Sequence, residues 1–279
     1  MKVAIIGLGL IGGSMALALR GKQLASEIVG VDANDIHQQK ALELGLVDKV
    51  MDIDSAISFA DLIILSVPVD IANKLLPKLL LRLNNQVVMD VGSTKNAVCE
   101  LASNAVNGKR FVATHPMWGT EFSGPAAAVK GAFTNKAVVI CNKENSDADA
   151  LELVEKIYHN LGMHMIYMDA AAHDLHAAYI SHISHITSFA LANTVLEKEK
   201  EDEAIFALAS GGFESTVRLA KSNAQMWVPI FMQNKENVLD VLNEHISQLR
   251  KFKSCLEKEN YEYLAELIEN ANTINRILK

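Results

Sequence analysis

A glycine-rich turn lies between an apolar run and a helical stretch at the start of this 279-residue chain. The apolar run covers residues 3–6, and the turn that follows reads Gly7-Leu8-Gly9-Leu10-Ile11-Gly12. A second apolar run, residues 28–31, ends on Asp32. This order and spacing are typical of a dinucleotide-binding site, where a strand leads into a tight turn and a helix N-terminus faces phosphates. The sequence therefore predicts a nucleotide site formed by the turn and by Asp32.

Each part of this pattern has a distinct expected role. Gly7 permits the tight turn, Gly9 lets the main chain approach a pyrophosphate, and Gly12 lets the helix pack close to the strand. Asp32 can accept hydrogen bonds from ribose hydroxyls and would repel a 2′-phosphate. The expected cofactor is therefore NAD rather than NADP.

The composition limits the partners and the compartment of the chain. Its net charge is −7 and it has no Lys/Arg cluster, which argues against a nucleic-acid partner. The cysteines, Cys99, Cys141 and Cys255, are scattered and form no Cys-x-x-Cys pair, which favours a reducing cytoplasm. The apolar run 62–69 is too short to span a membrane, and the nucleotide turn begins too early for a signal peptide. We therefore expect a cytoplasmic protein that is not attached to a membrane.

Short apolar runs alternate with amphipathic stretches over the first 170 residues or so. The predicted strands are Val3–Ile6, Glu27–Val31, Leu62–Ser66, Gln86–Val91, Phe111–Thr114, Ala137–Cys141 and His164–Met168. Amphipathic stretches such as 35–44, 71–80 and 151–161 separate many of these strands. This alternation predicts an α/β fold with a doubly wound, mostly parallel sheet of the Rossmann type.

The pattern changes after Asp169, where strand signals stop and helical patterns follow. Helices are predicted over residues 171–196, 203–208, 225–252 and 261–278. We therefore predict an NAD-binding domain at 1–169 and an all-helical domain for substrate binding and dimerisation at 170–279. The helical part carries many apolar positions, which suits pairing with a second subunit. The alternative is that these helices pack only against the first domain.

Ligands of an open α/β sheet bind beyond the carboxyl ends of its strands. Four such ends carry polar or unusual residues: the glycine turn at 7–12, then Ser66-Val67-Pro68, then 90–95, then 114–121. This arrangement predicts that Ser93 and His115 lie on the same rim as the cofactor.

His115 suits the role of a general base, because an imidazole titrates near neutral pH. Ser93 can bond to that ring or to a substrate hydroxyl. The alternatives are a His115 bonded to the main chain and a Ser93 that caps the next helix. Lys95 is expected in the first turn of that helix, exposed to solvent.

Two further groups of residues can carry chemistry. The pairs His173/His176 and His182/His185 each share a helix face, with Asp174 beside them. The usual zinc patterns are missing, so we predict no metal site and expect one or two of these histidines to face an interdomain cleft. In a third segment, Arg218 can pair with a substrate carboxylate or with a glutamate of the chain, and spacing alone does not separate these two interpretations.

Taken in order, these motifs resemble the prephenate/arogenate dehydrogenase family of tyrosine biosynthesis. The matching segments are residues 7–14, 90–95, 115–121, 181–185 and 213–218, with Met226-Trp227. The segment His-Pro-Met-Trp-Gly-Thr-Glu at 115–121 is quite specific, and the ordered series is more specific than any one segment. The resemblance covers essentially the whole chain.

The resemblance implies a function and a set of roles. The implied reaction is the NAD-dependent oxidative decarboxylation of prephenate to 4-hydroxyphenylpyruvate, carried out by a homodimer. His115 would accept the proton of the ring hydroxyl, and Ser93 would orient His115. Arg218 would bind the ring carboxylate. The implied substrate pocket comprises Arg218, His185, Glu121, Thr120 and Trp227.

Several alternatives stay open. Many family members carry an Asp before the Thr-x-Arg element, where this chain has Ser215, and a Ser-Asp-Pro before the Trp, where it has Asn223 and Ala224. These departures leave open an arogenate or a dual-specificity cyclohexadienyl dehydrogenase. A β-hydroxyacid dehydrogenase usually relies on a lysine of the interdomain helix, where this chain has histidines. A non-catalytic NAD-binding sensor would have no need for Ser93, His115 and Arg218 together.

Overall fold

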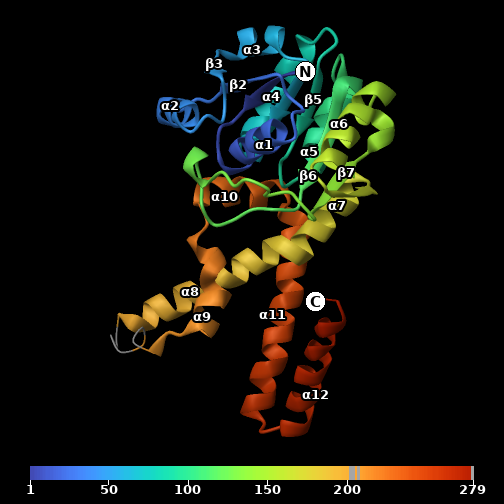
Figure 1. The fold of residues 1–279 in the computed structure, drawn as a ribbon. Helices are drawn as coiled ribbons and strands as arrows, with labels where there is room; N and C mark the ends of the chain where they lie inside the picture. The colour runs from blue at the N-terminus through green and yellow to red at the C-terminus, as the bar shows by residue number, and fades with distance from the viewer. Residues whose placement is uncertain (201–204, 206–207, 278–279) are drawn as a thin grey trace. The chain divides into compact units, whose positions relative to one another are not determined.

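The computed structural model describes residues 1–200, 205 and 208–277 of the chain. Its centre is an eight-stranded sheet with the strand order β3-β2-β1-β4-β5-β6-β7-β8 (Figure 1). The strands are β1 (Lys2–Ile6), β2 (Glu27–Val31), β3 (Lys49–Val50), β4 (Leu62–Leu65), β5 (Val87–Asp90), β6 (Phe111–Pro116), β7 (Ala137–Cys141) and β8 (His164–Met168). Neighbouring strands are parallel except for the pair β6 and β7. The predicted doubly wound, mostly parallel sheet is confirmed, and the two-residue β3 is the strand that the sequence pattern did not indicate.

Helices cover both faces of this sheet. They are α1 (Leu10–Gly21), α2 (Asp35–Glu43), α3 (Ile53–Phe59), α4 (Val69–Leu81), α5 (Asn96–Ser103) and α6 (Ala148–Asn160). Successive strand residues point to opposite faces, so strands covered on both sides must be apolar throughout. In β1, Val3 and Ile5 pack in the core with α1, α2 and α6, while Ala4 and Ile6 pack with α3, α4 and α5. The result is three layers with a core on each side of the sheet.

The described chain after β8 is helical, as predicted. The elements are α7 (Ala170–Ala177), the π-helical turn η4 (Ala178–His182), α8 (Ile183–Glu199), α9 (Gly211–Val217), η6 (Arg218–Lys221), α10 (Ala224–Gln233), α11 (Lys235–Glu257) and α12 (Tyr261–Asn272). The helix predicted at 203–208 lies mostly outside the described residues. The stretch predicted as one helix over 225–252 is two helices, because Asn234 leaves helical geometry between α10 and α11.

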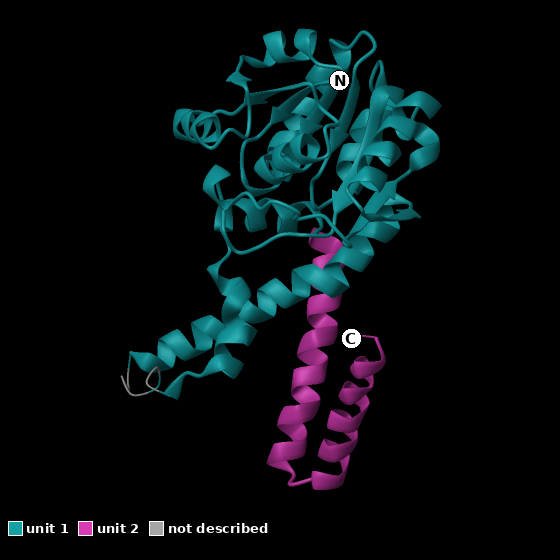
Figure 2. Ribbon diagram, viewed as in Figure 1, with its two compact units in different colours: residues 1–234 teal, residues 235–279 magenta. Residues whose placement is uncertain are grey.

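The chain forms two compact units, residues 1–234 and 235–279 (Figure 2). The first contains the sheet, its covering helices and the helices from α7 to α10. The second consists of α11, α12 and the short turn η7 (Thr273–Arg276). None of the helices in the described residues is long and apolar enough to cross a membrane.

Candidate active site

The glycine-rich turn joins β1 to α1. β1 is the strand at which the strand order of the sheet reverses, with β2 on one side and β4 on the other. Gly7 has a φ of +99°, and a Cβ there would lie 2.4 Å from the Ser66 carbonyl oxygen. A Cβ on Gly12 would lie 2.0 Å from the Gly7 carbonyl oxygen. By contrast, a Cβ on Gly9 would meet nothing within 4 Å. Gly7 and Gly12 are thus required by packing, whereas Gly9 borders open space where a ligand can approach the main chain.

Asp32 is held directly opposite this turn. Its Oδ2 accepts a hydrogen bond from the Leu8 amide at 2.7 Å, and its Oδ1 accepts one from the Asn34 amide at 2.9 Å. His37 Nδ1 lies 3.6 Å from the same carboxylate. Two main-chain donors therefore fix the orientation of Asp32, and the remaining lone pairs of its oxygens can still accept hydrogen bonds.

A cleft of about 530 Å³ connects the nucleotide turn with the ends of β4, β5 and β6. It also reaches residues of η4, α8, η6 and α10. The predicted site residues that line it are Gly9, Leu10, Ile11, Ser66, Val67, Pro68, Ser93, His115, Thr120, Glu121, His185, Arg218 and Trp227. Gly7, Leu8 and Gly12 form the turn itself, and Asp32 accepts a hydrogen bond from it; these four residues do not line the cleft. Residues far apart in the sequence thus meet in one cavity.

His115 lies at the end of β6 and is partly buried. Its Nδ1 lies 2.8 Å from Nε2 of His173, and His173 Nδ1 lies 2.8 Å from Oδ1 of Asp174. Within the described residues, the partner of the His115 ring is therefore His173 rather than Ser93. Burial is the largest cause that lowers the pKa of His115 well below its usual range, followed by the neighbouring His173 and Lys95. His115 is accordingly a neutral imidazole at pH 7.

Asp174 is held by main-chain donors at the start of α5. Its Oδ1 accepts from the Lys95 amide at 2.7 Å, and its Oδ2 accepts from the Asn96 amide at 2.9 Å. The side chain of Asn234 donates to the Asp174 carbonyl oxygen at 2.6 Å. The cap that we considered for Ser93 is thus provided by Asp174, which lies 79 positions away from Lys95 in the sequence.

The π-helical turn η4 sets which side chains of this long helical stretch face the cleft. An α-helix turns by about 100° per residue, so an uninterrupted helix would place Ser181 and His185 about 80° and 120° away from His173. A π turn takes up one extra residue, which turns the residues after it back by about 100° and brings His185 to within about 20° of the direction of His173. Ser181 lies within η4 and is turned back by part of this angle. Ser181 and His185 do line the cleft. His182, in the same turn, is buried, and His176 is exposed.

Lys95 corrects one expectation from the sequence. We expected this side chain in solvent, but it is fully buried and forms an ion pair with Asp90. Its Nζ also donates to the Thr114 carbonyl oxygen at 2.8 Å. Asp90 in turn accepts from the amides of Gly92 and Thr114 at 3.0 and 3.1 Å. The buried pair therefore ties the loop that carries Ser93 to the strand that carries His115.

A second, more exposed ion pair lines the cleft. Arg218 Nη1 donates to Oε2 of Glu121 at 3.0 Å, so the internal glutamate pairing considered for Arg218 does form. The Glu121 main-chain amide and then Arg218 lower the pKa of the Glu121 carboxyl. Half of the Arg218 side chain is exposed, and both residues line the cleft. The guanidinium can therefore still exchange partners with an anion that enters.

An aromatic pair also lines the cleft. The rings of His185 and Trp227 stack with their centroids 3.5 Å apart, and Trp227 is buried against Val69 and Ile230. Burial is the main cause that lowers the pKa of His185, so this ring too is neutral at pH 7. This stacked pair can contact an apolar ring. His185 Nδ1 lies 3.0 Å from the Ser181 carbonyl oxygen, which leaves Nε2 as the nitrogen of this ring that can bond to a ligand.

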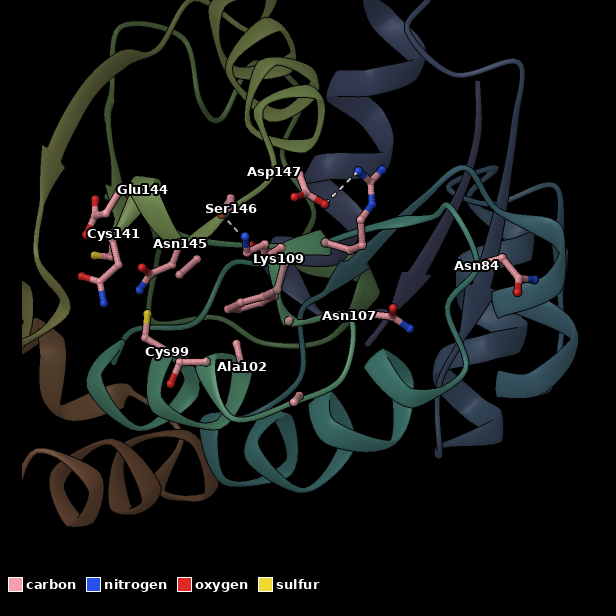
Figure 3. Close-up of a pocket in the computed structure, with 17 residues that line it drawn as sticks. Asn84, Cys99, Ala102, Asn107, Lys109, Cys141, Glu144, Asn145, Ser146 and Asp147 are labelled. Carbon is pink, nitrogen blue, oxygen red and sulfur yellow. Dashed lines mark hydrogen bonds and ion pairs between the residues drawn. The ribbon is translucent and has the colours of Figure 1, made fainter.

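A second cavity of about 520 Å³ contains none of the predicted site residues (Figure 3). Cys99 and Cys141 are among the residues that line it, and burial raises the pKa of the Cys99 thiol to about 12 and that of Cys141 further. Both therefore stay protonated and are poor nucleophiles or metal ligands. Within the described residues, no group of three or more His, Cys, Asp or Glu side chains is placed to hold a metal ion.

Family models match almost the whole chain. Residues 15–167 match the nucleotide-binding domain of prephenate dehydrogenase, and residues 169–270 match its dimerization domain. The chain belongs to the prephenate dehydrogenase family. It is thus an oxidoreductase, and the first matched range contains Ser93 and His115 while the second contains Arg218 and Trp227.

Individual relatives agree with this assignment. The chain is 31% identical to the prephenate dehydrogenase of Bacillus subtilis over 96% of this chain and 74% of that protein. It is 29% identical to the cyclohexadienyl dehydrogenase of Zymomonas mobilis over 99% of this chain and 96% of that protein. Among solved structures, prephenate dehydrogenase from Aquifex aeolicus in complex with hydroxyphenyl propionate and NAD+ is similar with a TM-score of 0.91 and 31% identity, covering 100% and 98% of the two chains. The arogenate dehydrogenase of Synechocystis gives a TM-score of 0.79 at 28% identity, covering both chains completely.

Proposed function

We propose that this chain is an NAD-dependent prephenate dehydrogenase that oxidatively decarboxylates prephenate to 4-hydroxyphenylpyruvate. One observation carries this proposal: a single cleft contains the open face of the nucleotide turn, a neutral histidine and an exchangeable arginine. Oxidation of a ring alcohol with loss of carboxylate needs a hydride acceptor, a base and a carboxylate anchor. The cleft offers all three within one cavity.

The cofactor end of the cleft fits NAD. The open surface at Gly9 suits a pyrophosphate, and Asp32 suits the hydroxyls of an adenosine ribose. Ser66 Oγ donates to the Gly7 carbonyl oxygen at 2.6 Å, so it supports the turn, while Val67 and Pro68 border the cleft beside it. Bound NAD would accept the hydride that leaves the substrate ring. The relative from Aquifex aeolicus was solved with NAD+ and a phenolic ligand in place.

The catalytic end is assigned to His115 and Ser93. His115 accepts the proton of the ring hydroxyl on Nε2, because its Nδ1 already faces His173. Ser93 lies on the same rim and contacts that hydroxyl. The electrons of the bond to the departing carboxylate complete the aromatic ring, so the products are carbon dioxide, the phenol and reduced cofactor. The enzyme mainly has to position the substrate and keep its base neutral.

The substrate end is assigned to the residues around the ion pair. Arg218 leaves Glu121 to bind the ring carboxylate, with two charge-assisted hydrogen bonds. Glu121, Thr120 and His185 face the side chain of the substrate. Trp227, which stacks on His185, packs near the substrate. An arogenate side chain carries an ammonium group that Glu121 would attract, so this end decides between prephenate and arogenate.

The proposal includes an organisation and a location. We divide the chain into a nucleotide domain, 1–169, and a helical domain, 170–279, through which two copies form a homodimer. The ranges of the two family models, 15–167 and 169–270, support this division, and the second model describes a dimerization domain. The buried free thiols Cys99, Cys141 and Cys255 suit the reducing cytoplasm.

The test is NADH production by the purified chain with NAD, given prephenate and arogenate in separate assays. We expect turnover with prephenate that falls by about 100- to 10,000-fold in His115→Asn, because the variant lacks the base but retains the nucleotide turn. NAD affinity, measured by calorimetry, should stay within about twofold as a control. Turnover with both substrates would identify a cyclohexadienyl dehydrogenase. Full activity of His115→Asn would remove His115 from the mechanism, and silence with both substrates would contradict the proposed function.

A further inference from the structure

The cleft does not account for two of the most buried polar residues near it. His173 and Asp174, on α7, are only 2% and 3% exposed, and neither lines the cavity. Polar groups buried this deeply need partners, and they are arranged in a row that ends at His115. The row begins at the two main-chain amides of residues 95 and 96.

The main-chain amides determine which atom donates and which accepts in each hydrogen bond of this row. An amide N–H can only donate, so the two amides favour an ionised Asp174 that accepts. An ionised Asp174 accepts from His173, which places a proton on His173 Nδ1 and leaves its Nε2 as an acceptor. The His115 Nδ1 that faces this Nε2 at 2.8 Å must then carry a proton. The lone pair of His115 is left on Nε2.

We infer that His173 is a positioning residue that holds His115 in the tautomer whose Nε2 lone pair faces the cleft. This inference rests on the proposed function, which makes His115 the base. With the opposite tautomer, His115 would present an N–H to the substrate hydroxyl and could not take its proton. The row also anchors the ring, because a partner at 2.8 Å and a T-shaped contact with a centroid distance of 5.0 Å both restrict its rotation.

His173 also supports the charged form of His115. When His115 takes up the substrate proton, both of its nitrogens carry protons, and Nδ1–H still donates to His173. Asp174, at the far end of the row, is the carboxylate that this chain of hydrogen bonds links to the new charge. Lys95 and His182, which also lie near His115, act against that charge. The row therefore adds an acceptor where the surroundings otherwise disfavour a cation.

Two variants of His173 and one matched control test this role. His173→Leu removes the acceptor for His115 Nδ1–H, and His173→Gln restores an amide oxygen that can accept from it. His176→Leu, on the same helix but exposed, serves as the control. We expect His173→Leu to lower kcat by about 10- to 100-fold while KM for prephenate and Kd for NAD stay within about twofold. His173→Gln should recover part of kcat, and His176→Leu should match the wild type.

A second measurement reads the tautomer without any turnover. In the wild-type protein labelled with ¹⁵N-histidine, NMR should show the His115 proton on Nδ1, and in His173→Leu it should move toward Nε2. A wild-type His115 that carries its proton on Nε2 would overturn the inference, as would unchanged kcat in a folded His173→Leu. Because the wild-type spectrum needs neither substrate nor a folded variant, a failure of the proposed reaction is distinguishable from a failure of this inference.

Discussion

Two ion pairs lie at the proposed active site in contrasting environments: Arg218 and Glu121 line the cleft, whereas Lys95 and Asp90 lie beneath the loop that carries Ser93. The Lys95–Asp90 pair is buried, with side chains 0% and 2% exposed, whereas Arg218 and Glu121 are 50% and 15% exposed. The buried pair is tied to the main chain at Gly92 and Thr114 by further hydrogen bonds. The exposed pair has one hydrogen bond of 3.0 Å between its members.

The difference separates a structural ion pair from an exchangeable one. A buried charge cannot lose its partner without a large desolvation penalty, so Lys95 and Asp90 lock the main chain beside Ser93 and His115. An exposed pair contributes only about 0–1 kcal/mol, so an incoming carboxylate can replace Glu121 on Arg218 at little cost. Under the proposed function, the cleft thus combines a rigid reaction end with a recognition end whose arginine can change partners.

The largest expected effect comes from breaking the buried pair. Lys95→Met should lower the free energy of unfolding by about 3–5 kcal/mol, because it leaves the Asp90 charge buried without its cation. Urea unfolding followed by circular dichroism measures this change.

The control for this variant is Lys40→Met, which removes an exposed lysine paired with Glu43 and should cost less than about 1 kcal/mol. Adding Asp90→Asn to Lys95→Met should recover part of the loss, since the unpaired charge disappears. If Lys95→Met were as stable as Lys40→Met, the buried pair would have no structural role and the comparison would lose its basis.

The same contrast explains what could be predicted from the sequence. The strands, the glycine turn and the rim positions of Ser93 and His115 follow from local patterns, because a short apolar run specifies a buried strand. The burial of Lys95 does not, since a lysine before a helix is usually solvated. Its burial depends on Asp90 and Thr114 being brought together by the sheet.

The partner of His115 could not be predicted from the sequence for a related reason. His173 lies 58 positions away in the sequence, on a helix whose facing side depends on the π turn. The 3.6-residue period of a regular helix places Ser181 and His185 on a different face from His173. Sequence reasoning therefore found the histidines as a group but could not say which were buried, exposed or facing the cleft.

The next effect in size concerns the exchangeable pair and falls on binding rather than folding. Arg218→Ala should raise KM for prephenate by about 10- to 100-fold, the loss expected for charge-assisted hydrogen bonds to a carboxylate. Stability should change by less than about 1 kcal/mol, because the guanidinium is half exposed. Steady-state kinetics and urea unfolding of the same preparation measure both quantities.

Two variants sharpen this prediction. Lys221→Ala removes a neighbouring cation that does not line the cleft, and its KM should match the wild type. Glu121→Gln frees Arg218 of its internal partner, so KM for prephenate should fall or stay constant, while any turnover of arogenate should weaken. A loss of stability in Arg218→Ala equal to that of Lys95→Met would show that this pair is structural after all.

The smallest expected effect is on the pH dependence of stability, which should arise from the buried histidines rather than from the exposed ion pair. Burial lowers the pKa of His182 from 6.5 to about 4, so the unfolded chain binds a proton more readily than the folded chain between those values. The stability that neutral His182 gives to the folded state is complete above pH 6.5 and is lost as the pH falls toward 4. By pH 5 this loss lowers the free energy of unfolding by about 2 kcal/mol. His115 and His185, with pKa values lowered in the same direction, act in the same range, whereas the Glu121 contribution is lost only below its usual value of 4.5. The difference in unfolding free energy between pH 8 and pH 5 should therefore shrink by about 1–2 kcal/mol in His182→Gln and stay unchanged in His176→Gln. An equal difference in His182→Gln and the wild type would mean that acid sensitivity does not originate at this buried histidine.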